Sequence, residues 1–158
     1  MTTRQTCGFT LIELLVTLAL ISLFATMALP LAELTVKRSQ EAELRAALRT
    51  IREALDAYKQ AGDDGRIAVR PGDSGYPKNL NILVEGVEDL QSPEKKQLHF
   101  LRRIPPNPLA DPALKAEKSW GQRSYKSPYD RPRPGDDVYD VYALSTEAGI
   151  NGVPYNEW

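Results

Sequence analysis

Apolar residues dominate the N-terminal part of the chain in one continuous run. From Phe9 to Leu34 the only charged residues are Glu13 and Glu33. As a helix, residues 9–34 would extend about 39 Å, which covers a bilayer core of about 30 Å. A secretory signal would begin with a basic segment and carry a shorter apolar region. The pattern therefore predicts a transmembrane helix over residues 9–34.

After this run the apolar positions continue at helical spacing. Alternating steps of four and three residues connect the members of one stripe, which are Leu44, Leu48, Ile51, Leu55 and Tyr58. Opposite charges stand four residues apart in Glu41–Arg45, Arg49–Glu53 and Arg52–Asp56. Two glycines and two aspartates at 62–65 favour the end of a helix. We expect an amphipathic helix over 35–61, with one face packed on a small core.

Residues 62–158 form the remaining part of the chain, and their many prolines and glycines predict short elements. Asn79 is suited to cap a short helix that contains Leu80, Leu83, Val84 and Val87. A second helix is expected from Ser92–Pro93 to Arg103, because serine suits the cap and proline the first helical position.

Strand patterns come later in the chain. Residues 138–144 read Val-Tyr-Asp-Val-Tyr-Ala-Leu, a β-branched and aromatic pattern, and 124–126 are a weaker candidate. A proline-rich loop over 128–135 would join them. The expected fold class is α+β, with a long N-terminal α-helix and a small antiparallel β-sheet head packed on its second half.

Glu13 is the one costly residue inside the apolar run. A carboxylate deep in hydrocarbon costs about 2.5 to 3.5 kcal/mol even on a lenient scale. Cleavage between Gly8 and Phe9 would create an ammonium about 6 Å from Glu13 along a helix axis, and an ammonium can pair with the carboxylate. Snorkelling to the headgroups or protonation of Glu13 is the alternative explanation.

Residues 8–16 read Gly-Phe-Thr-Leu-Ile-Glu-Leu-Leu-Val. This stretch resembles the processing and methylation motif of type IV prepilins and type II secretion pseudopilins. The resemblance implies cleavage after Gly8 by a prepilin peptidase, N-methylation of Phe9, and a role for Glu13 in subunit assembly. Pro30 corresponds to a proline around which the family's helix loosens in the filament. Cys7 stands where the family usually has a basic residue.

The rest of the chain resembles the major pseudopilin family of type II secretion more than type IV pilins. The segments that carry this similarity are Tyr76-Pro77, Leu101 to Pro105, Trp120-Gly121 and Tyr155 to Trp158. In that family a late loop binds calcium, so the resemblance makes Ser145, Glu147 and Asn151 candidate oxygen ligands. No other cofactor is expected.

Charge and motifs give little support to catalysis or to nucleic-acid binding. Lysine plus arginine total 20 and aspartate plus glutamate 21, so no charge excess indicates a partner. His99 is the only histidine and Cys7 the only cysteine, so no intramolecular disulfide can form. The densest basic patch is Lys95, Lys96, His99, Arg102 and Arg103. A solvated helix face explains this patch better than DNA contacts.

The sequence thus predicts a structural subunit that is not an enzyme. Its expected parts are a leader peptide (1–8), a transmembrane and assembly half-helix (9–34), an amphipathic half-helix (35–61) and a periplasmic head (62–158). The inner membrane would anchor the precursor by a single pass, and the processed chain would polymerise into a periplasmic pseudopilus that drives type II secretion. Expected partners are other copies of the chain, minor pseudopilins, prepilin peptidase and the inner-membrane secretion platform.

Two alternatives remain open. The chain could be a minor pseudopilin or a type IV pilin, including one of a DNA-uptake pseudopilus. It could also be a periplasmic binding domain that uses residues 9–34 only as a membrane tether.

Overall fold

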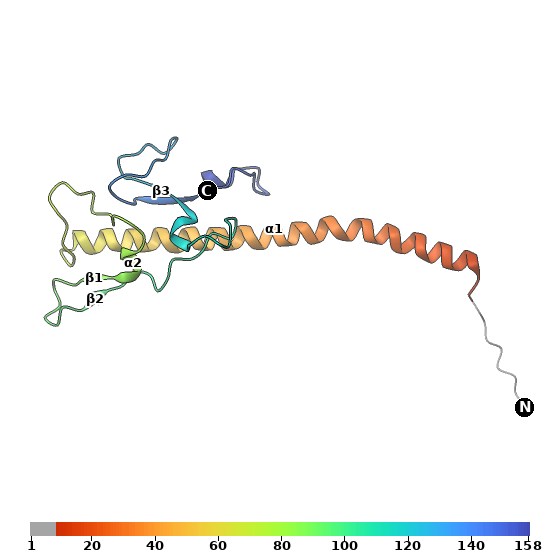
Figure 1. The fold of residues 1–158 in the computed structure, drawn as a ribbon, viewed down its shortest axis with the longest axis horizontal. Helices are drawn as coiled ribbons and strands as arrows, with labels where there is room; N and C mark the ends of the chain where they lie inside the picture. The colour runs from red at the N-terminus through yellow and green to blue at the C-terminus, as the bar shows by residue number, and fades with distance from the viewer. Residues whose placement is uncertain (1–8) are drawn as a thin grey trace, which may run out of the picture. The chain divides into compact units, whose positions relative to one another are not determined.

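The computed structural model describes residues 9–158, without the side chains of 27–31. One helix, α1, runs from Leu11 to Asp63 and is 53 residues long (Figure 1). The chain divides into two compact units, of which the first ends at Ser39 and the second comprises Gln40–Trp158. The predicted half-helices 9–34 and 35–61 are therefore parts of one α-helix.

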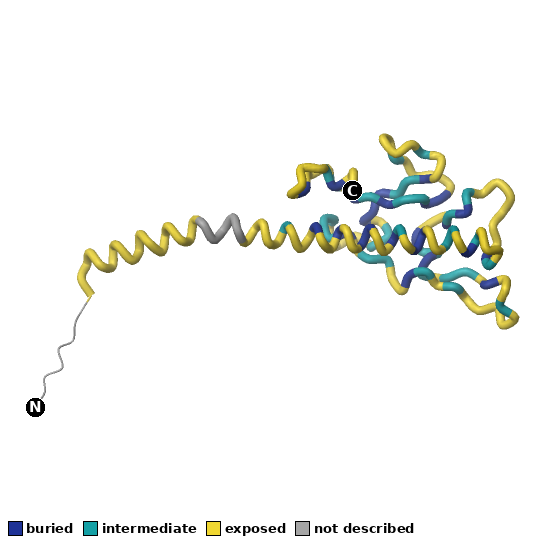
Figure 2. Tube along the Cα trace, turned by 180° about the vertical axis from the view of Figure 1, so that it is seen from behind, coloured by how far each residue is buried: buried dark blue, intermediate teal, exposed yellow. Residues whose placement is uncertain are grey.

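The first unit has no buried side chain among its described residues. Its helical positions are almost all exposed, as the yellow stretch in Figure 2 shows. Hydroxyls in this part bond back to the helix itself, with Ser22 Oγ donating to Leu18 O at 2.8 Å and Thr26 Oγ1 to Leu23 O at 2.7 Å. Such bonds satisfy a polar side chain locally on an apolar helix.

The second unit contains the hydrophobic core. The predicted stripe on α1 is confirmed, because Leu44, Leu48, Ile51 and Leu55 are buried and Tyr58 packs against them. Around this stripe lie residues from the rest of the unit, namely Leu80, Leu83, Leu101, Trp120, Val138, Val141, Ala143 and Tyr155. The head is thus organised around the second part of α1.

The end of α1 follows the predicted signal, whereas the next short helix differs from the prediction in its cap and its length. Gly65 adopts a φ of 70° and Arg66 N donates to Ala61 O at 2.9 Å, which ends the helix within the predicted 62–65 cluster. Helix α2 spans Ile82–Glu85. Its N-cap residue is Asn81 and not the predicted Asn79, whose side chain accepts a hydrogen bond from Ile82 N at 3.2 Å from two positions before the cap. The helix is also shorter than predicted, because Leu80 precedes it and Val87 lies in a strand.

The predicted helix over 92–103 is wrong, because this region forms a β-hairpin. Strand β1 (Val87–Glu88) pairs antiparallel with β2 (Gln97–Leu98). Ser92 lies in the connecting turn, where Lys95 N donates to its carbonyl at 3.0 Å and Lys95 takes a φ of 50°. A positive φ at a lysine is incompatible with an α-helix.

Tertiary contacts explain the hairpin. Arg66 Nη2 lies 2.6 Å from a carboxylate oxygen of Asp89, and Leu90 N donates to Arg66 O at 2.7 Å. After the second strand, the amides of Phe100 and Leu101 donate to the carbonyl of Leu83. These non-local bonds outweigh the local helix preference of Ser92 and Pro93. Each bond pairs a backbone or charged group that a helix over 92–103 would place away from its partner.

The second strand pair carries the other side of the head. Strand β4 (Asp140–Ala143) confirms the expected strand within 138–144, whereas the partner strand β3 is Trp120–Arg123 and not 124–126. Residues 124–127 instead form a turn, in which Ser127 N donates to Ser124 O at 3.0 Å. A Cβ at Gly121 would lie 2.4 Å from the ring of Tyr142, so this register requires glycine.

The predicted α+β fold class is confirmed, with one refinement. In the described chain the strands form two separate two-stranded antiparallel sheets, β1–β2 and β3–β4, where a single sheet was expected. Figure 1 shows them on different sides of the second part of α1. Two short 3-10 helices, η1 (Ala116–Lys118) and η2 (Tyr155–Glu157), complete the unit.

Candidate assembly site

The first unit presents large apolar side chains to its surroundings along its whole described length. Phe9 is 84% exposed. The other large exposed residues before residue 27 are Leu11, Ile12, Leu14, Leu15, Val16, Leu18, Leu20, Ile21, Leu23 and Phe24. Apolar surface of this extent on a chain calls for a partner, either lipid or another protein.

Glu13 lies at the start of α1. Its backbone N–H donates to Thr10 Oγ1 at 3.3 Å, and Leu14 N donates to Thr10 O at 3.1 Å, so Thr10 caps the helix. A carboxylate in the first turn is favoured by the helix dipole. Phe9 and Thr10 precede the helix, so the distance from Phe9 to Glu13 is not the helical rise that the sequence analysis assumed.

The other predicted processing and assembly residues are only partly described. Gly8, Cys7 and the leader 1–8 lie outside the described residues. Pro30 lies within α1, but its side chain is outside the description. The processing and assembly roles therefore stay predictions.

Among the residues that the structure describes, no helix is both long and apolar enough to cross a membrane.

Glu41 is a functional candidate that the sequence analysis did not identify. It stands on the second part of α1 and its residue surface is only 3% exposed. One carboxylate oxygen accepts hydrogen bonds from Ile150 N at 2.6 Å and from the Tyr155 hydroxyl at 3.1 Å. The other oxygen lies 3.4 Å from Arg45 Nη2. The predicted Glu41–Arg45 pair therefore forms, but Glu41 also binds Ile150 and Tyr155 and so connects the C-terminal segment to α1. We call this arrangement the Glu41 anchor.

The environment of Tyr155 supports this anchor. Burial, and next the neighbouring Glu41 carboxylate, raise the pKa of the Tyr155 phenol above its ordinary value. The phenol therefore stays protonated and can donate to Glu41. The ring meets Trp158 edge-on at 4.9 Å, and the Arg45 guanidinium lies 4.2 Å from the Trp158 ring centroid.

Arg52 makes a second connection between α1 and the end of the chain. Its Nε donates to Asp140 at 2.8 Å, and its Nη2 donates to Val141 O at 3.1 Å and to Trp158 O at 2.8 Å. The expected Arg52–Asp56 pair is replaced by these contacts. Together with the Glu41 anchor, they fasten residues 140–158 to one helix.

The three calcium candidates lie on the segment held by this anchor. Ser145 Oγ accepts from Glu147 N at 3.3 Å, and Asn151 Oδ1 accepts from Val153 N at 3.1 Å, so both oxygens already support local turns. Among the described residues, no group of three or more His, Cys, Asp or Glu side chains could hold a metal ion. Calcium binding at Ser145, Glu147 and Asn151 stays a prediction.

The remaining polar candidates have structural contacts. His99 Nδ1 lies 2.9 Å from Val84 O. Lys95 and Lys96 pair with Glu88 and Glu94 at 3.2 and 2.8 Å. The basic patch thus lies on the β1–β2 hairpin and the residues after it, and not on the helix face that the sequence suggested.

Comparison with known proteins supports the prediction of a prepilin-like N-terminal motif. Residues 3–29 match the prokaryotic N-terminal methylation motif. This motif indicates a precursor of the type IV pilin-like or pseudopilin class, whose members are structural subunits and not enzymes. No curated protein and no solved structure matches the chain. The match covers the start of α1 and the residues before it.

Proposed function

We propose that the chain is a type II secretion pseudopilin, processed between Gly8 and Phe9 and polymerised through the first unit of α1. The observation that carries this proposal is the combination of a methylation motif at 3–29 with exposed apolar side chains on the first part of α1. The precursor would be anchored in the inner membrane by a single pass over residues 9–34, with residues 35–158 in the periplasm. Its partners would be prepilin peptidase, the inner-membrane secretion platform, minor pseudopilins and other copies of itself.

Exposure of the apolar residues supports both stages of this proposal. Transferring apolar surface out of water is worth about 25 cal/mol per Å², so lipid in the precursor and neighbouring helices in the filament are equally suitable surroundings. Glu13 supplies the specificity, because a carboxylate in such surroundings needs a positive partner. The N-methylated ammonium of Phe9 on a neighbouring copy carries the required positive charge. Phe9 lies just before α1 of that copy.

The second unit supports a structural role. Its core and its ion pairs, among them Arg52–Asp140 and Arg66–Asp89, hold the segments around α1 together. A minor pseudopilin or type IV pilin would share these features, and gene neighbours for the secretion ATPase and secretin would favour the pseudopilin.

Mass spectrometry of the native N-terminus tests the proposal. We expect a mature chain that begins with N-methylated Phe9 when prepilin peptidase is present, and an unprocessed chain when it is absent. Electron microscopy of the processed protein should then show filaments. A chain that keeps Met1, or one that starts at another residue, would contradict the proposal.

A further inference from the structure

Two exposed loops leave the β3–β4 pair from different ends of its ladder. Residues 126–133, here called the basic loop, lie in the connection from β3 to β4. Residues 144–153, here called the C-terminal apex, follow the other end of β4. The basic loop leaves the ladder at its Arg123–Asp140 end, and the C-terminal apex leaves it at the Trp120–Ala143 end.

The separation of the two loops runs along α1. The C-terminal apex is held by Glu41 through Ile150 N, whereas the first residue of β4, Asp140, is held by Arg52. Glu41 and Arg52 are both on α1 and eleven positions apart in the sequence, which corresponds to about 16 Å of helix. The tip of the basic loop folds back over the strands, since Tyr129, Asp130 and Pro132 line one pocket together with Arg52, Tyr142 and Trp158.

Hydrogen bonds hold the basic loop in one conformation. The Ser127 hydroxyl accepts from Arg133 N at 2.8 Å and donates to Arg131 O at 3.1 Å. At the base of the loop the buried Asp137 carboxylate accepts from Ser124 Oγ at 2.6 Å and from Tyr125 N at 2.9 Å. Three prolines at 128, 132 and 134 further restrict the backbone. Docking such a loop costs little ordering entropy.

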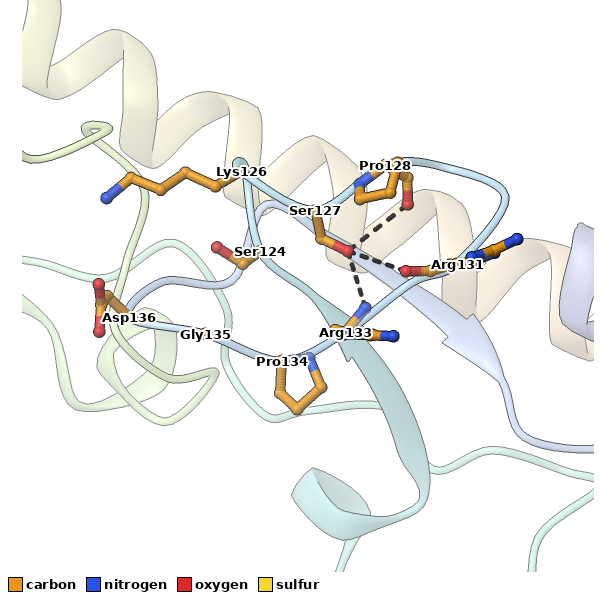
Figure 3. Close-up of a pocket in the computed structure, with 9 residues that line it drawn as sticks. All are labelled: Ser124, Lys126, Ser127, Pro128, Arg131, Arg133, Pro134, Gly135 and Asp136. Atoms are coloured by element: carbon orange, nitrogen blue, oxygen red, sulfur yellow. Dashed lines mark hydrogen bonds between the residues drawn. The ribbon is translucent and has the colours of Figure 1, made fainter.

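The basic loop presents the side chains that protein interfaces use most. Tyr129 is 85% exposed, and Lys126, Arg131 and Arg133 are exposed around it. Figure 3 shows Lys126 and Arg131 extending away from the Ser127 hydroxyl in opposite directions. Asp130 is the loop's only carboxylate and lies 3.9 Å from Arg131. Tyrosine and arginine are enriched at the energetic centres of interfaces.

The C-terminal apex has the complementary character. Leu144, Ile150 and Val153 are exposed large apolar residues. Glu147 is exposed and is the only charged residue of 144–153. The backbone is ordered by the Ala148–Pro154 bridge, by Gly149 N donating to Val153 O at 2.9 Å, and by Glu41. The apex is thus a fixed apolar surface with a negative charge beside it.

We infer that the basic loop of one copy docks on the C-terminal apex of a second copy, with Tyr129 against Ile150 and Val153. Arg131 and Arg133 would face Glu147. Since the two surfaces differ, the contact is heterologous, with one surface on each copy. A heterologous contact continues from copy to copy and gives an open polymer where the rotation does not close a ring, whereas a two-fold dimer needs the same surface on both copies. The inference rests on the proposed polymerisation and names the head surfaces that would take part in it.

Photo-crosslinking in assembled filaments tests this contact. Tyr129 would be replaced by p-benzoylphenylalanine in one population of full-length chains, mixed with unmodified chains labelled with ¹⁵N. We expect irradiation to join position 129 of one population to a peptide within 144–153 of the other. The same replacement at the exposed Leu90, on the turn of the β1–β2 hairpin, is the matched control and should not give this product.

Charge-reversal variants test whether the arginines of the basic loop contribute to the contact. Arg131→Glu with Arg133→Glu should lower the crosslink yield at least about tenfold, because like charges then face each other. Adding Glu147→Arg should restore part of the yield, whereas Lys95→Glu with Lys96→Glu on the hairpin should leave it unchanged.

The outcomes separate this inference from the proposed function. Filaments that form without a crosslink from position 129 to 144–153 of another copy would overturn the docking contact and leave the proposed function intact. Absence of filaments from processed, unmodified protein would contradict the proposed function. A crosslink confined to chains of the same population would also overturn the contact, because it would be intramolecular.

Discussion

The two parts of α1 carry the same kinds of apolar side chain in opposite surroundings. Leu15 in the first unit is 59% exposed, whereas Leu44 in the second unit is fully buried. Between Phe9 and Leu34 of the first unit, most positions are apolar and they lie on every side of the helix. In the second they are restricted to one stripe, and charged residues such as Glu43 and Arg49 occupy exposed positions between them.

This difference shows which part of the helix is complete within one chain. The stripe from Leu44 to Leu55 is covered by residues of the same chain, so its burial contributes to folding of the head. The described apolar residues of the first unit are exposed, so their burial would contribute to association with lipid or with other copies. Substitutions should therefore separate assembly from stability according to the unit in which they fall.

The largest effect is expected for Glu13→Ala. Loss of the Glu13 carboxylate should abolish filament assembly, because this carboxylate is the proposed partner of a neighbouring N-terminal ammonium. Filament yield by electron microscopy should fall more than about tenfold, while urea unfolding of the head stays unchanged. Glu33→Ala is the control and should assemble normally. Normal filaments of the Glu13 variant would contradict the proposed pairing of Glu13 with the neighbouring ammonium.

Matched leucine substitutions test the comparison directly. Leu44→Ala should lower the free energy of unfolding of the head by about 3 to 5 kcal/mol, because it leaves a cavity in the core. Leu15→Ala should leave this free energy unchanged. Chemical denaturation followed by tyrosine and tryptophan fluorescence measures both, and equal effects of the two substitutions would contradict the division into units.

A smaller effect is expected at the Glu41 anchor. Glu41→Ala should cost about 1 to 3 kcal/mol, because Ile150 N and the Tyr155 hydroxyl lose a charged acceptor in a buried place. Hydrogen exchange should accelerate at the amide of Ile150 and around it, with little change at the β1–β2 hairpin. Glu43→Ala, two residues further along α1 and exposed, is the control. Unchanged exchange at Ile150 would contradict the anchor.

The smallest effect is a pH dependence at Asp137. Burial alone would raise the pKa of this carboxyl, but hydrogen bonds from Ser124, Ser74 and Tyr125 outweigh it and hold the pKa below its usual value. The charged form is therefore favoured in the folded state. This contribution is fully present above the unfolded pKa of about 3.9 and is lost as pH falls through the lower folded value. Asp137→Asn should flatten the decrease in unfolding free energy between about pH 5 and pH 2. An unchanged slope would show that Asp137 does not contribute.

The α1 stripe, the apolar run, the end of α1 near Gly65 and the strand β4 could be predicted because their signals are local. Helical periodicity, capping side chains and β-branched residues act on neighbouring backbone groups, so a short stretch of sequence contains both partners. The methylation motif has the same character, since residues 3–29 carry it as one continuous stretch. The sequence by itself therefore determined the helix, the α+β class and the pilin-like N-terminus.

Only the tertiary structure decided what the polar residues on α1 do. Glu41 and Arg52 were expected to pair with residues four positions away, but their main partners are 109 and 88 positions further along the chain. The hairpin at 87–98 replaced a helix for the same reason, since Arg66 and Leu83 bind its ends. Such partners come together only after the core has formed, because burial of the apolar stripe brings distant segments to one helix and a buried charge then needs the nearest donor.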